Sequence, residues 1–83
     1  MKLTKTQEKI IKLMYKGYTL MIHQNDENGS ISYIVSKGYD NIFFRGDVFS
    51  KLLQNELIYQ QYSHPFDYVL TSLGEEIGKN LNK

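Results

Sequence analysis

The sequence predicts one small α+β domain in which helices and β-hairpins alternate. The chain has 83 residues, a length that suits a single domain. Three segments repeat apolar residues at helical spacing. The segments between them alternate apolar and polar residues and are bounded by clusters of turn-forming residues. The predicted order over residues 1–83 is therefore α-β-β-α-β-β-α.

The first helix is predicted over residues 5–16. Thr4 and Gln7 have the spacing of a capping box, in which two side chains satisfy free backbone N–H groups at a helix start. The apolar face that follows has helical spacing: Ile10, Ile11 and Met14. Gly17 stands where a residue of left-handed conformation commonly ends a helix.

A β-hairpin is predicted next, with strands over residues 19–24 and 31–35. The cluster Asn25–Gly29 between them is a turn. Residues 36–41 are predicted to be a loop. The apolar segment 42–44 that follows fits no single state.

The second helix begins near Asp47, which we expect to be its N-cap. Its predicted core face consists of Phe49, Leu52, Leu53 and Leu57. Its predicted exposed face consists of Ser50, Lys51, Gln54 and Asn55.

A second hairpin has predicted strands over residues 58–62 and 68–71, with a turn over 63–67 in which Pro65 fixes the backbone. Ser72 with Glu75 then predicts a second capping box. The core face of this last helix is expected to hold Leu73, Ile77 and Leu81. Its two glycines, Gly74 and Gly78, each cost about 1 kcal/mol relative to alanine, unless they allow two backbones to approach closely.

Composition excludes several classes of protein. The chain has no cysteine, which excludes disulfide scaffolds, thiolate zinc sites and cysteine nucleophiles. No apolar run approaches the ~20 residues that span a bilayer. The first residues also lack the apolar core of a signal peptide. We therefore expect a soluble cytoplasmic protein with no membrane partner.

The net charge of +1 argues against both a strongly basic nucleic-acid binder and an acidic DNA mimic. The charge is uneven, however. Residues 1–16 hold five lysines and one glutamate, whereas residues 52–83 carry two more acids than bases. Such asymmetry can matter more than the total.

Four of those lysines form a row on the first helix: Lys5, Lys9, Lys12 and Lys16. At 100° per residue they lie within about 60° of one another. One interpretation is a stripe that contacts the phosphates of a nucleic acid. The other is the solvated back of an amphipathic helix.

The second half of the chain resembles a known family. The segment Phe49–Ile58 resembles the end of a winged-helix recognition helix and its apolar exit into the wing. The segment Tyr68–Ile77 is similar to the "Y-x-L-T-x-x-G" passage from the second wing strand to the closing helix. Winged helix-turn-helix regulators of bacteria and phages carry these patterns. The resemblance covers about residues 47–83 and, more loosely, the first helix.

The resemblance implies a winged-helix-like fold with the hairpin over residues 57–71 as the wing. Two features differ from the family. The predicted hairpin over residues 19–35 stands where the family has a helix, and this wing carries no Lys or Arg.

The function that the resemblance implies is that of a small non-enzymatic DNA-binding regulator from a phage or mobile element. The second helix would contact bases or phosphates through Arg45, Ser50, Lys51 and Gln54, side chains that suit such contacts. The first helix would hold phosphates through Lys5, Lys9 and Lys12. A homodimer is expected, because one copy offers few contacts. A merely solvated polar surface is the alternative interpretation of the second helix.

A protein-binding module is the rival hypothesis, for example a phage-encoded inhibitor of a host or defence complex such as an anti-CRISPR protein. The near-neutral charge, the wing without cations and the seven tyrosines favour it, because tyrosine is enriched at interfaces. The candidate contact residues are Tyr18, Tyr39, Tyr59 and Tyr62.

No catalytic or metal site is predicted. His23 and His64 are far apart in sequence and lack metal-ligand spacing. No nucleophile–base pair and no glycine-rich phosphate loop is present, so we expect neither an enzyme nor a cofactor. At the wing tip, the aromatic rings of Tyr62, His64 and Phe66 could stack on bases or enter a pocket of a partner. The alternative is that Tyr62 packs across the strands and that Phe66 folds beneath the turn, and for Phe66 we expect the alternative.

Overall fold

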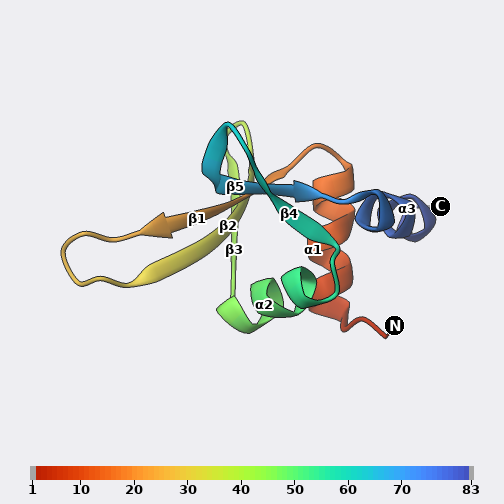
Figure 1. Cartoon of the computed structure of the whole chain (residues 1–83), viewed down its shortest axis with the longest axis horizontal. Helices are drawn as coiled ribbons and strands as arrows, with labels where there is room; N and C mark the ends of the chain where they lie inside the picture. Colours follow the sequence, from red (N-terminus) through yellow and green to blue (C-terminus); the bar gives the residue numbers. More distant parts are fainter. Residues whose placement is uncertain (1, 83) are drawn as a thin grey trace.

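The computed structural model describes residues 2–82, which form one five-stranded antiparallel sheet and three helices (Figure 1). The elements are α1 Lys5–Tyr15, β1 Thr19–Gln24, β2 Ile31–Lys37, β3 Asp40–Phe44, α2 Gly46–Gln54, β4 Ile58–Gln61, β5 His64–Leu70 and α3 Ser72–Leu81. The strands lie in the order β3-β2-β1-β5-β4. The predicted α+β class is confirmed.

α1 begins and ends where its local sequence predicts. The Thr4 hydroxyl accepts a hydrogen bond from the Gln7 N–H (3.2 Å), and the Gln7 side chain accepts one from the Thr4 N–H (3.0 Å). At the other end Gly17 has a φ of 107°, and the Tyr18 N–H donates to the Leu13 carbonyl at 3.1 Å. This Schellman pattern satisfies carbonyl groups that the helix end leaves free.

The predicted loop over residues 36–41 is wrong, because β2 and β3 form a tight hairpin there. Lys37 pairs with Asp40, which leaves a turn of two residues. Gly38, with a φ of 62°, is the first of them, where a type II′ turn takes glycine. The added strand makes the order α-β-β-β-α-β-β-α, which differs from the predicted one.

The start of α2 also differs from the prediction. Its N-cap is Arg45, and no side chain caps the helix. Asp47 lies in the first turn instead. Leu53 is exposed, although it was predicted in the core, because Val48 faces the core together with Phe49.

The second hairpin turns earlier than predicted. Gln61 pairs with His64, so the turn is Tyr62–Ser63 and not residues 63–67. The pairing is irregular beside this turn: Gln60 pairs with Tyr68, whereas Gln61 pairs with His64, so three residues of β5 have no partner on β4.

Thr71 caps α3, where Ser72 was predicted. The Thr71 hydroxyl accepts from the Gly74 N–H at 3.1 Å and donates to the Glu56 carbonyl at 2.6 Å, so it joins the end of α2 to the start of α3. Of the three side chains predicted for the core face of α3, Leu73 is exposed and the other two pack against the core.

The glycines of α3 allow a close approach of backbones, which was one of their two predicted roles. A Cβ on Gly74 would lie 2.2 Å from the Leu57 carbonyl oxygen, and one on Gly78 would lie 2.8 Å from the Tyr15 Cβ. Neither distance is compatible with a side chain. The missing side chains therefore let α3 pack directly on α1 and on the segment after α2.

The two faces of the sheet have different surroundings. Leu20 of β1 pairs with Val35 of β2, and both are buried in the core with side chains of α1 and α2. Because successive side chains alternate between faces, Met21 and its partner Ile34 point away from that core. Phe43 pairs with Ile34 and completes an apolar row across three strands, and its side chain is 67% exposed.

Candidate functional site

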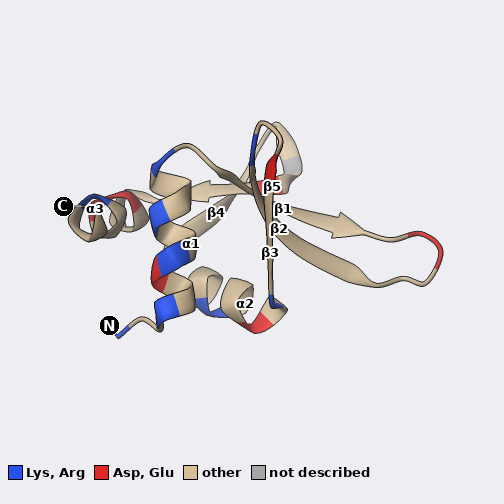
Figure 2. Cartoon of the chain, turned by 180° about the vertical axis from the view of Figure 1, so that it is seen from behind, with Lys and Arg blue, Asp and Glu red and all other residues tan. Residues whose placement is uncertain are grey.

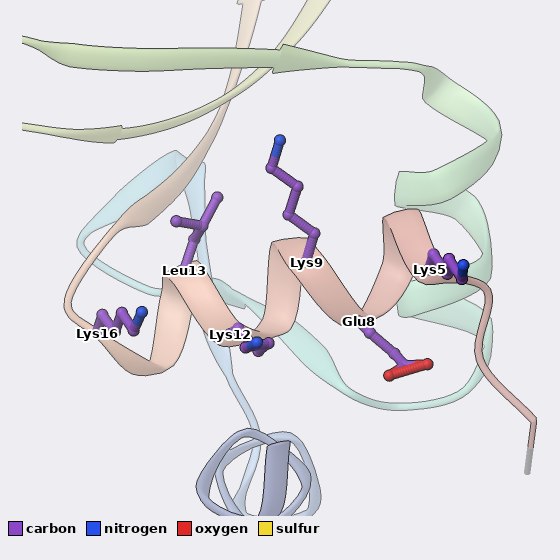
Figure 3. Close-up of a pocket in the computed structure, with 6 residues that line it drawn as sticks. All are labelled: Lys5, Glu8, Lys9, Lys12, Leu13 and Lys16. Atoms are coloured by element: carbon purple, nitrogen blue, oxygen red, sulfur yellow. The ribbon is translucent and has the colours of Figure 1, made fainter. Parts of the chain in front are cut away.

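Three lysines of α1 and the lysine at its C-cap form the predicted row along the helix: Lys5, Lys9, Lys12 and Lys16 (Figure 3). Lys12 is half-buried, and the other three are exposed. The row lies opposite the buried side chains of α1. With Glu8 and Leu13, these lysines line a shallow depression of about 320 Å³. All six lining residues belong to α1 or its C-cap, so the depression lies on the surface of one helix and is not a cleft between elements.

The ammonium groups of this row have no ion-pair partner among residues 2–82. The ion pair found there joins Arg45 Nε to Asp47 Oδ1 at 3.3 Å. In Figure 3 the Glu8 carboxylate points to the other side of α1 from Lys9. Like charges three and four residues apart repel by a few tenths of a kcal/mol per pair. An anion bound along the row would relieve that repulsion.

A further lysine reaches the row from the sheet. The Nζ of Lys37, the last residue of β2, donates to the Lys16 carbonyl oxygen at 2.9 Å. Nearby, the Tyr18 hydroxyl donates to the Asp40 carboxylate, and this hydrogen bond raises the pKa of Tyr18. Together the two contacts hold the β2–β3 turn against the end of α1. No local sequence signal indicated Lys37, because it meets α1 only through the pairing of β1 with β2.

At its other end the row meets α2. A depression of about 430 Å³ between the start of α1 and α2 is lined by Lys2, Thr4, Gln7, Lys51, Gln54 and Asn55. Two side chains predicted as contacts, Lys51 and Gln54, thus lie beside the beginning of the row. The seven lysines that follow α1 from end to end are called the basic tract: Lys2, Lys5, Lys9, Lys12, Lys16, Lys37 and Lys51 (Figure 2).

The other two predicted contacts on α2 add less charge. The Arg45 side chain is 88% exposed, and its charge is balanced by the Asp47 carboxylate, with which it forms an ion pair. It shares a groove of about 530 Å³ with Lys51 and the first turn of α1. Ser50 is exposed and lies four residues before Gln54, on the same side of the helix. α2 therefore offers one unmatched cation together with several polar side chains.

The four tyrosines predicted for a protein interface differ in position and exposure. Tyr18 and Tyr59 line a groove of about 450 Å³ together with Gly17 and Glu75. Tyr18 is half-buried, and Tyr59 is 52% exposed. Tyr39 and Tyr62 occupy the turns of the β2–β3 and β4–β5 hairpins, and both are wholly exposed.

Phe66 does not fold beneath the wing turn as expected. It belongs to β5, as His64 does, and its side chain is largely exposed. It lines a shallow depression with Ile22, His23 and other residues at the end of β1. The apolar row Met21–Ile34–Phe43 was also missed, because β3 was not predicted.

Metal ligands, membrane-spanning helices and similarity to known proteins are three further features that could indicate a function. Within residues 2–82, no three His, Cys, Asp or Glu side chains gather as metal ligands would. In the same part of the chain, no helix has the length and apolarity needed to cross a membrane. Comparison with known proteins found no family model, no curated protein and no solved structure that matches this chain. The basic tract is therefore the candidate functional site.

Proposed function

We propose that this chain is a small non-enzymatic DNA-binding regulator, of the kind that phages and mobile elements encode, and that it holds DNA phosphates with the basic tract. One observation carries this proposal. Seven lysines from three parts of the fold follow α1, and none has an ion-pair partner among residues 2–82. Phosphate contacts of this kind supply much of the affinity of proteins for nucleic acids.

The dimensions of α1 fit this role. From Lys5 to Lys16 the helix rises by about 16 Å. Duplex DNA carries one phosphate charge per ~1.7 Å of its axis, so about ten phosphates lie within that length. Long flexible lysine side chains can reach several of them without a fixed register. Five such contacts would make a fourfold rise in salt concentration lower the affinity about 500-fold.

Base contacts are assigned to α2 in this proposal. Gln54 and Arg45 have the donor and acceptor groups that suit base edges. Arg45 can leave Asp47 at little cost, because an exposed ion pair contributes at most about 1 kcal/mol. Ser50 on the same helix can contact a phosphate or a base edge.

A winged-helix-like architecture, bound to DNA as a dimer, is part of the same proposal. The succession of α2, the β4–β5 hairpin and α3 supports it, because it matches the recognition helix, wing and closing helix of the family that the sequence resembles. The strands β1, β2 and β3 occupy the chain where that family has a helix. Since the wing carries no Lys or Arg, phosphate contacts are left to α1.

A DNA titration tests the proposal. The protein is titrated with a mixed-sequence duplex at about 50 and 200 mM salt, and the slope of log K against log salt counts the phosphates engaged. The double variant Lys9→Ala/Lys12→Ala should lower that slope by about 2. Lys79→Ala on α3 is the matched control, because Lys79 lies outside the basic tract. Absence of binding at the lower salt concentration would overturn the proposal.

A protein-binding module, such as an inhibitor of a host or defence complex, is the second candidate function. The observation that favours it is the apolar row Met21–Ile34–Phe43 on the face of the sheet that points away from the core. Exposed apolar patches commonly mark interaction surfaces. The test is a binding assay with a defined host complex. Binding by the wild type and by Lys9→Ala/Lys12→Ala, together with loss of binding in Phe43→Asp, would support this function over DNA binding.

A further inference from the structure

The basic tract ends at a turn that two contacts fix in place. Lys37 Nζ donates to the Lys16 carbonyl oxygen at 2.9 Å, and the Tyr18 hydroxyl donates to the Asp40 carboxylate. Lys37 and Asp40 flank the two-residue β2–β3 turn, so both sides of the turn are tied to the end of α1. Whatever the turn carries is therefore held beside the last lysines of the tract.

The turn carries an aromatic side chain that no packing explains. Tyr39 is 104% exposed relative to a fully accessible tyrosine, and within residues 2–82 it makes no hydrogen bond or ring contact. Its Cα lies at most about 7 Å from that of Lys37, because only Gly38 stands between them. An aromatic plane thus stands open at the end of a line of cations.

Cations that follow a phosphate backbone, together with an exposed aromatic ring, are what proteins use to bind single-stranded nucleic acid. A base inside a duplex stacks on its neighbours on both faces, whereas an unpaired base has a face free for an aromatic ring. We propose that the basic tract binds single-stranded DNA, with one unpaired base stacked on Tyr39. This inference rests on the proposed function, and it adds that the bound strand is unpaired at the C-terminal end of α1.

Tyr62 provides a matched control within the same fold. It is as exposed as Tyr39 and also lies in a two-residue hairpin turn. Its hairpin, β4–β5, contains no Lys or Arg. If exposure alone made a tyrosine bind DNA, the two would be equivalent; if the neighbouring lysines are needed, only Tyr39 should contribute.

The test compares a mixed-sequence oligodeoxynucleotide with its duplex, each titrated by fluorescence anisotropy at about 50 mM salt. The proposal expects the single strand to bind more tightly. Tyr39→Ala should weaken its binding by about tenfold without changing the salt slope, because stacking one base contributes ~1–3 kcal/mol and no charge is lost. Tyr39→Phe should retain the affinity, and Tyr62→Ala should leave it unchanged.

Two results would overturn the inference in different ways. Equal affinities for strand and duplex, with Tyr39→Ala behaving like Tyr62→Ala, would overturn the single-strand assignment and leave the DNA-binding function standing. No binding of either DNA at this salt concentration would overturn the function itself. Tyr39 lies in an exposed turn, so circular dichroism should show both alanine variants to be as folded as the wild type.

Discussion

The β2–β3 and β4–β5 hairpins have similar tips and different surroundings. Each ends in a two-residue turn that carries a wholly exposed tyrosine, Tyr39 in one and Tyr62 in the other. The first turn is tied to α1 through Lys37 and Asp40 and lies at the end of the basic tract. The second belongs to a hairpin without a single cation. The charges around a tyrosine, and not its exposure, therefore distinguish a candidate contact from a merely solvated ring.

The largest expected effect comes from removing the lysines nearest the first hairpin. Lys12→Ala/Lys16→Ala should weaken binding of single-stranded DNA about 50- to 100-fold at about 50 mM salt, because each lost contact lowers the salt slope by about 0.7. Anisotropy titrations at several salt concentrations measure both quantities. Lys79→Ala on α3 is the control and should stay within twofold of the wild type. A double variant that kept the wild-type slope would show that these lysines are only solvated.

Replacing the lysine that joins the hairpin to α1 should have the next largest effect. Lys37→Met keeps most of the side-chain length and removes both the charge and the hydrogen bond to Lys16. We expect a loss of affinity of about tenfold, with a salt slope lower by about 0.7. Lys37→Arg keeps the positive charge and should retain the wild-type affinity and salt slope.

This variant also sharpens the comparison of the two tyrosines. In the Lys37→Met background, Tyr39→Ala should weaken DNA binding less than it does in the wild type, because the turn is no longer held beside the tract. An equal loss of affinity in the two backgrounds would mean that Lys37 and Tyr39 act independently.

The parts of the fold that the sequence predicted correctly depend on contacts between near neighbours. The capping box of Thr4 with Gln7 and the left-handed Gly17 each involve residues within about one turn of α1, so the pattern alone identifies them. The row of lysines on α1 follows from helical periodicity in the same way. These features needed no knowledge of the rest of the chain.

The features that the prediction missed depend on distant partners. The N-cap of α3 is Thr71, whose hydroxyl also reaches the Glu56 carbonyl, fifteen residues earlier. β3 has only five residues and exists through its pairing with β2. Lys37 joins the candidate site because the pairing of β1 with β2 places it beside the end of α1, twenty-one residues after Lys16. No periodicity in the sequence encodes such a contact.

A smaller effect is expected from substitutions that test the backbone conformation of the two turns. Gly38 has a φ of 62° and open space around it, so Gly38→Ala introduces conformational strain without a steric clash. We expect the free energy of unfolding to fall by about 1 kcal/mol. An alanine in the other turn, Ser63→Ala, involves no positive φ and should alter the free energy of unfolding by less than about 0.5 kcal/mol. Urea denaturation measures both, and equal losses would contradict the assigned turn geometry.

The smallest effect concerns the hydrogen bond from Tyr18 to Asp40, and it appears only at high pH. This bond raises the pKa of Tyr18 above its ordinary value of 10.0 by favouring the neutral hydroxyl in the folded state. Its contribution to stability is therefore complete below pH 10 and is lost as the pH rises through the raised pKa. The difference in urea midpoint between wild type and Tyr18→Phe should accordingly narrow above pH 10. Tyr62→Phe, in the turn without such a partner, should show no corresponding change. A difference in urea midpoint that stayed constant across the pH range would mean that the Tyr18 hydroxyl does not tie the β2–β3 turn to α1. The turn would then keep its position through Lys37 and strand pairing alone.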